Sequence, residues 1–120
     1  MRVCGVMSGT SLDGIDVAVV DIARGKITPV IHRTVPYPKA VREAVLSVSN
    51  TMTHTAAIAR LHFLLGELYA EAITETCRRR VKLASIELIG MHGQTIFHEG
   101  SPVEFLGRKV ASTYQIGDAA

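Results

Sequence analysis

The sequence contains no tryptophan, only two cysteines and 5% aromatic residues among its 120 positions. Cys4 and Cys77 lie far apart in apolar surroundings and lack the close spacing of metal ligands. The cysteines therefore indicate neither a zinc site nor a disulfide framework. We expect both to be buried thiols in a reducing compartment.

Long hydrophobic runs are absent as well. No stretch approaches the roughly 18 consecutive apolar residues that a membrane-spanning helix needs. The N-terminus passes directly into a strand-like pattern that contains Gly5, where a signal peptide would have its apolar core. We therefore expect a cytoplasmic protein with no membrane partner.

An excess of charge is also missing, because 13 Lys and Arg against 11 Asp and Glu give a formal net charge of +2. The single basic run, Arg78 to Arg80 with Lys82, falls where a helix is expected to end. There it would complement the helix dipole, an interpretation we favour over a nucleic-acid patch. With 48% hydrophobic and 20% charged residues, the composition is that of a globular domain with no nucleic acid partner.

Local patterns predict a sheet with helices packed against it. Three apolar stretches separated by turn residues predict a three-stranded meander, and apolar residues recurring every three or four positions predict two helices. After the helices, a strand that ends in a polar loop is expected, and a further short strand precedes the C-terminus. The expected elements are strands at 2–7, 15–22 and 27–35, helices at 39–48 and 55–81, and strands at 87–91 and 113–116.

The longer helix is expected to carry one apolar stripe and to be capped by Thr53 or Thr55. The stripe consists of Ile58, Leu61, Leu65, Leu68 and Ala72. Strands followed by crossover helices and another strand imply a mixed sheet in an α/β fold. Because no repeat, low-complexity tract or linker is visible, we expect residues 1–120 to contain no internal domain boundary.

A loop rich in glycine and hydroxyl groups joins the first two expected strands within residues 5–16. Its backbone N–H groups and hydroxyls can cradle phosphate oxygens, and Asp13 and Asp16 can hold magnesium directly or through water. The loop lacks the Gly-Lys-Ser/Thr ending of a Walker A loop, and Ser8 lacks the frame of a nucleophile elbow. The alternative is a hairpin whose glycines and aspartates only satisfy turn geometry.

A second polar cluster follows the strand expected at 87–91. It consists of His92, Gly93, Gln94 and Thr95 and continues to His98. Because α/β sheets bind ligands beyond the carboxyl ends of their strands, we expect a substrate loop here, with His92 as hydrogen-bond donor or base. The alternative is a structural histidine. Metal ligation is not expected, since two histidines six residues apart do not share a helix face.

A third segment, residues 115–118, is compatible with an ordinary turn when taken alone. The remaining histidines are expected to be structural or exposed, and His62 to pack at the edge of the core. They are His32, His54 and His62.

Together, the three segments resemble the anhydro-N-acetylmuramic acid kinase family, in the same order and at similar spacing. They read Gly5-Val6-Met7-Ser8-Gly9-Thr10-Ser11-Leu12-Asp13-Gly14-Ile15-Asp16, His92-Gly93-Gln94-Thr95 and Gln115-Ile116-Gly117-Asp118. The resemblance covers essentially all 120 residues. It implies the N-terminal part of an ATP-binding lobe of the actin, Hsp70 and sugar-kinase fold (ribonuclease H-like), which begins with a three-stranded meander followed by helix and strand.

The resemblance further implies an ATP-dependent kinase that opens the 1,6-anhydro ring of anhydro-N-acetylmuramic acid. Its product would be the 6-phosphate of N-acetylmuramic acid, in peptidoglycan recycling. The implied ATP phosphate loop consists of Gly9, Thr10, Ser11, Leu12, Asp13, Gly14, Ile15 and Asp16, with Mg²⁺ at Asp13 and Asp16. The implied contacts to the amino-sugar substrate are His92, Gly93, Gln94 and Thr95.

In this family the aspartate that activates water lies in an Asp-Phe-Arg segment after the third motif, and these 120 residues do not contain it. We therefore expect the catalytic base beyond Ala120, no such role for Asp118, and an inactive 120-residue chain. An incomplete lobe would leave apolar surface uncovered, so we also expect self-association or a homo-oligomer. The alternatives are an actin-like nucleotide-binding module without sugar chemistry and a small non-enzymatic interaction domain.

Overall fold

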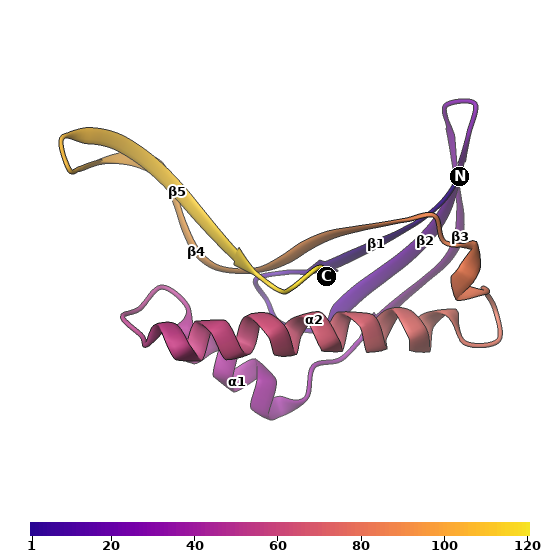
Figure 1. Cartoon of the computed structure of the whole chain (residues 1–120), viewed down its shortest axis with the longest axis horizontal. Coiled ribbons are helices and arrows are strands. Elements are labelled where there is room, and N and C mark those ends of the chain that lie inside the picture. The colour runs from indigo at the N-terminus through magenta and orange to yellow at the C-terminus, as the bar shows by residue number, and fades with distance from the viewer.

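The computed structural model describes residues 1–120, which form one five-stranded sheet with two helices on one face (Figure 1). The strands follow the order β3-β2-β1-β4-β5 across the sheet. The elements are β1 (Arg2–Ser8), β2 (Ile15–Ala23), β3 (Lys26–Val35), α1 (Lys39–Val48), α2 (Thr55–Cys77), a 3₁₀ turn (Leu83–Ser85), β4 (Leu88–Phe105) and β5 (Arg108–Ile116). The predicted mixed α/β architecture is confirmed.

The first three strands form the predicted antiparallel meander. Between β2 and β3 the chain turns through Arg24 and Gly25, whose φ angles of 50° and 75° are those of a two-residue hairpin turn. After both helices, β4 returns to pair with β1 in parallel, with Val6 opposite Met91. This pairing places the end of β1 beside Gln94 in the first half of β4, so the first two polar segments lie side by side.

The core lies between the sheet and α2. Alternate residues of β2, among them Val17 and Val19, are fully buried beneath the helices. On α2 the predicted apolar stripe is confirmed, with Leu61 and Leu65 in the core. The opposite face of the sheet carries no helix (Figure 1).

Both cysteines are buried and free, as predicted. Burial raises the pKa of the Cys4 thiol to about 11, and it also raises the pKa of Cys77. At the edge of β1, the Arg2 guanidinium donates to Asp21 at 2.8 Å, and this hydrogen bond lowers the pKa of the Asp21 carboxyl. Neither helix is long and apolar enough to cross a membrane.

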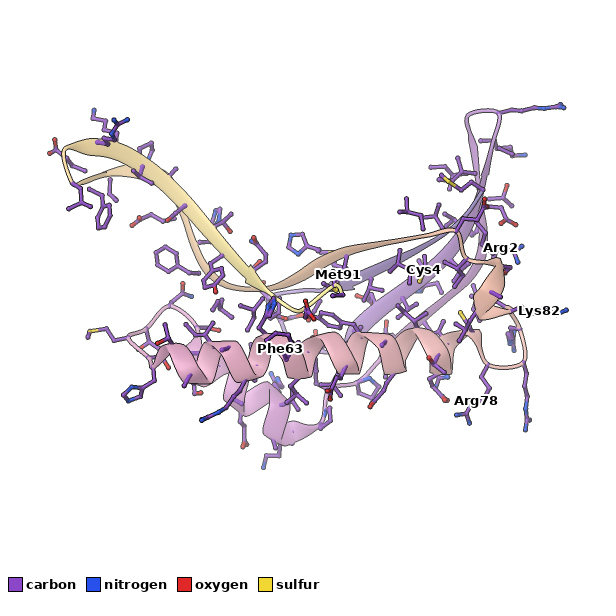
Figure 2. All side chains as sticks on the ribbon, viewed as in Figure 1. Arg2, Cys4, Phe63, Arg78, Lys82 and Met91 are labelled. Atoms are coloured by element: carbon purple, nitrogen blue, oxygen red, sulfur yellow. The ribbon has the colours of Figure 1, made fainter.

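The predicted bounds of α2 are wrong at its C-terminal end. The helix ends at Cys77, four residues before the expected position, and the chain turns back through Arg79 at a φ of 61°. The basic run therefore follows the last helical turn, and Arg78 and Lys82 extend away from the sheet (Figure 2). Burial of Val81 in the core gives a physical reason for the early turn.

The predicted cap of α2 is also wrong. His54 occupies the N-cap position, and neither Thr53 nor Thr55 caps the helix with its side chain.

The second polar segment is not a loop. Residues 92–98 lie inside β4, an 18-residue strand that pairs with β1 along its first part and with β5 along the rest. Leu106 and Gly107, at φ 50° and 79°, close a hairpin from which β5 returns. The expected strand at 113–116 is confirmed and begins five residues earlier, at Arg108. The outer half of this hairpin extends beyond the helices (Figure 1).

Candidate functional site

The glycine loop occupies residues 9–14, between β1 and β2. Within itself it makes one backbone hydrogen bond, from Leu12 N–H to Gly9 O at 3.1 Å. Leu12 adopts a φ of 55° and is buried, so it anchors the loop on the core. The side chains of Thr10 and Ser11 are exposed, and their hydroxyls have no partner in the chain. The loop thus presents backbone and hydroxyl donors that are free to bind an anion.

Gly14 is required by close packing against β3. A Cβ atom at this position would lie 2.7 Å from the Val35 carbonyl oxygen and 2.8 Å from Thr34 Cγ2. The end of the loop is therefore fixed against the neighbouring strand. Gly14 therefore has a purely structural role, as expected if the loop is an ordinary hairpin. The exposed hydroxyls of Thr10 and Ser11 have no such role.

The two aspartates of the loop differ in their surroundings. Asp13 is exposed and forms no ion pair. Asp16 lies on β2, where its Oδ1 accepts a hydrogen bond from the Thr34 hydroxyl and lies 3.7 Å from His32 Nε2. Asp13 and the second oxygen of Asp16 are therefore the carboxylate oxygens free to hold a magnesium ion, directly or through water.

Gln94 lies inside the protein and not at a surface. Its side chain is 1% exposed, and its Oε1 accepts a hydrogen bond from the Ser8 hydroxyl at 2.5 Å. Tyr37 in turn donates to Ser8 Oγ at 2.7 Å, and the Tyr69 hydroxyl lies 3.4 Å from that of Tyr37. This buried chain, called here the Ser8–Gln94 brace, ties the end of β1 to β4 and α2.

Burial raises the pKa values of both tyrosines of the brace, that of Tyr69 most strongly. Tyr37 and Tyr69 therefore stay protonated at neutral pH, and Tyr37 acts as a hydrogen-bond donor. No sequence motif contains either tyrosine. Tyr69 continues the α2 stripe four residues after Leu65, a spacing that reveals its burial but not its hydroxyl contacts.

The other residues of the second motif, His92, Gly93 and Thr95, lie in different surroundings. His92 is exposed on the face of the sheet without helices, beside Met7 and Asp16. Gly93, at a φ of 77°, allows β5 to approach, because a Cβ there would lie 2.8 Å from the Ile116 carbonyl oxygen. Thr95 accepts a hydrogen bond from Gln115 at 3.2 Å.

The third motif is attached to α2. His62 Nδ1 accepts from the Gly117 N–H at 3.0 Å, and the His62 carbonyl accepts from the Asp118 N–H at 2.9 Å. Gly66 leaves room for this contact, since a Cβ there would lie 2.6 Å from Asp118 O. His62 is half-buried at the edge of the core, in agreement with its predicted role.

All three motifs thus meet around Tyr69. Its hydroxyl is part of the Ser8–Gln94 brace, and its ring lies so close to Gly117 that a Cβ atom on Gly117 would come within 2.7 Å of it. A depression of about 220 Å³ opens where the glycine loop, the end of α1 and β4 meet. A larger depression, about 550 Å³, lies between α2 and the end of β3 and includes only Ile15 from the motifs. We place the candidate site at the glycine loop, which forms one wall of the smaller depression.

The sheet, the helices on one face and the donor-rich loop after the central strand β1 define an α/β domain. The chain belongs to the anhydro-N-acetylmuramic acid kinase family, whose model matches residues 1–120. The predicted resemblance is confirmed.

Relatives in the family cover nearly the whole chain. The anhydro-N-acetylmuramic acid kinase of Bacillus cereus (strain ATCC 10987) is 43% identical over 128 residues, which cover 100% of this chain and 32% of the relative. That of Caldanaerobacter subterraneus subsp. tengcongensis is 41% identical over 124 residues, 98% of this chain and 31% of the relative. The chain therefore spans about a third of the length of these curated relatives.

Proposed function

We propose that this chain is the phosphate-binding part of an ATP-dependent kinase that acts on anhydro-N-acetylmuramic acid. The observation that carries the proposal is the glycine loop with its free donors, joined by the Ser8–Gln94 brace to the second motif. Family membership supports both the kinase class and the amino-sugar substrate. The strand order and the meander also agree with the actin, Hsp70 and sugar-kinase fold that we propose for the lobe.

In the proposed reaction, water attacks the anomeric carbon of the sugar, the bond from that carbon to the bridging oxygen breaks, and that oxygen takes the γ-phosphoryl group. A base outside these 120 residues would accept the proton of the water. Bound Mg·ATP would supply the phosphoryl group and leave as ADP. The products are N-acetylmuramic acid 6-phosphate and ADP, which balances one water, one sugar and one ATP.

The residues of this chain would bind and orient the phosphates. The N–H groups of Thr10 and Ser11 and their hydroxyls would donate to phosphate oxygens, and Asp13 would hold magnesium or its water ligands. Phosphoryl transfer depends chiefly on positioning and charge neutralisation, which a fixed donor loop provides. Leu12 and Gly14 keep the loop in place from below.

The test is transfer of labelled γ-phosphate from Mg·ATP to anhydro-N-acetylmuramic acid. It compares the 120-residue chain with a version extended along the same gene to the length of the relatives. Phosphosugar from the extended version alone is expected. A folded extended version that binds ATP but forms no phosphosugar would favour the actin-like nucleotide-binding module.

A further inference from the structure

The depression of about 220 Å³ beside the glycine loop has walls from three separate parts of the chain. Thr10 and Leu12 come from the loop, and β4 contributes the residues from Gln94 to His98. The third wall is the segment after α1, with Asn50, which no sequence motif singled out. We call this depression the Asn50 pocket.

The floor of the Asn50 pocket is apolar, because Leu12 and Ile96 are each only 3% exposed and belong to the core. Two apolar side chains remain open to solvent at its walls: Leu46 is 53% exposed and Phe97 is 40% exposed. Solvent-exposed apolar walls beside a buried apolar floor favour a ligand group with its own apolar part.

One polar group of the pocket, the Asn50 side-chain amide, is uncharged and available. This amide has no hydrogen-bond partner in the chain, and the Thr10 hydroxyl at the rim of the pocket is the one that would donate to phosphate. No Lys, Arg, Asp or Glu lines the pocket, and His98 is its one titratable group. A carboxylate would therefore find no lysine or arginine there, whereas a neutral amide would find both a donor and an acceptor in the Asn50 side chain.

The Asn50 wall is held in a fixed position. The Asn50 N–H donates to the Ile96 carbonyl at 2.8 Å, which joins the end of α1 to β4. Asn50 has a φ of 51°, a left-handed conformation that asparagine tolerates, and Ser49 Oγ donates to the Val45 carbonyl at 2.7 Å. The pocket therefore exists before any ligand arrives, which lowers the ordering cost of binding.

We propose that the Asn50 pocket is the subsite for the acetamido group of the amino sugar, an inference that rests on the proposed function. The methyl group would contact Leu12 and Ile96, and the Asn50 amide would hydrogen-bond to the acetamido group. The pocket is smaller than a complete ligand site, which suits one substituent of the sugar. The lactyl carboxylate of the substrate lies outside it.

The experiment is a titration of the ¹⁵N-labelled 120-residue chain, followed by NMR. The two probes are anhydro-N-acetylmuramic acid and its de-N-acetylated counterpart. We expect the acetylated sugar to shift the NMR signal of the Asn50 side-chain amide, and the de-N-acetylated sugar to bind at least tenfold more weakly. Equal affinities for the two sugars, or no shift at Asn50, overturn the subsite.

Substitutions at the walls sharpen the test. Asn50→Gly keeps the left-handed backbone and should weaken binding of the acetylated sugar about three- to tenfold, as expected for the loss of one neutral hydrogen bond. Phe97→Ala should weaken it as well. The matched controls are Met52→Ala, 98% exposed just after Asn50, and Phe105→Ala, 62% exposed on the same strand. Controls that weaken binding as much as the wall substitutions overturn the subsite.

The two proposals fail differently. Phosphosugar formation by the extended version without an Asn50 shift would leave the kinase function and remove the subsite. An Asn50 shift that depends on the acetyl group, with no phosphoryl transfer by the extended version, would leave the subsite and remove the kinase function.

Discussion

The Ser8–Gln94 brace predicts that its two central residues stabilise the protein together and not independently. Gln94→Leu keeps a similar volume but leaves the buried Ser8 hydroxyl without its acceptor. Ser8→Ala leaves Gln94 Oε1 without its donor and removes the acceptor of Tyr37. Each buried group left unpartnered costs about 1–3 kcal/mol, so each single variant should lose about 2 kcal/mol of unfolding free energy.

The double variant removes the donor and the acceptor at once. It should therefore lose less than the sum of the two single variants, with a coupling energy of about 1–2 kcal/mol. Urea unfolding followed by circular dichroism measures this, because a slope of about 2 kcal/mol per molar urea turns a loss of 2 kcal/mol into a midpoint lower by about 1 M. Ser47→Ala, an exposed helical hydroxyl, is the control and should change stability by less than about 0.5 kcal/mol.

Additive losses would refute this reasoning. If the double variant equals the sum of the single variants within about 0.5 kcal/mol, the two side chains do not share one interaction. Single losses below about 0.5 kcal/mol would likewise show that neither group depends on the other in the folded state.

Three further perturbations have expected outcomes. Gly66→Ala should destabilise the protein and expose the Asp118 amide to faster hydrogen exchange, because the added Cβ atom would lie 2.6 Å from Asp118 O. This clash should outweigh the helix propensity of alanine, which favours helices by about 1 kcal/mol over glycine. Gly90→Ala, with open space around it, is the control and should have neither effect. The pKa of Asp21 is lowered in the folded state, so the ionised carboxylate stabilises the protein above about pH 4, and this stabilisation is lost as the pH falls below that value. Below about pH 4, the urea midpoint of Asp21→Asn should therefore fall less steeply with pH than that of the wild type. Because its pKa is about 11, Cys4 should resist thiol reagents at pH 8 in the folded chain and react once urea unfolds it, whereas rapid labelling of the native chain would contradict its burial.

The meander and α1 were predictable because their signals are local. Turn residues separate the strands, and α1 begins and ends at the predicted residues, Lys39 and Val48. The first part of β4 was predicted as a strand at 87–91, but the length of the strand was underestimated. The polar residues from His92 onward resemble a loop when the partner strand is unknown. Pairing with β5 provides hydrogen-bond partners for their backbone groups, and the residues of the segment alone do not indicate this pairing.

The candidate site was predicted in part for a similar reason. The glycine loop could be found from its composition, because glycine and hydroxyl groups have a direct local meaning. Gln94 was predicted as a substrate contact, and the structure places it in the core, bound to Ser8. Tyr37 and Asn50 reach the site through contacts with distant strands, which no single-segment pattern reveals.

The parallel pairing of β1 and β4 has a consequence for folding. The Ser8–Gln94 hydrogen bond closes a sequence separation of 86 residues, whereas the β4–β5 hairpin is entirely local. Closing so long a loop costs more chain entropy than forming short-range contacts. We therefore expect the glycine loop and β4 to come together late in folding. A nucleotide or sugar that contacts both the glycine loop and β4 would then bind only the completely folded protein, and its binding would raise the midpoint of global unfolding.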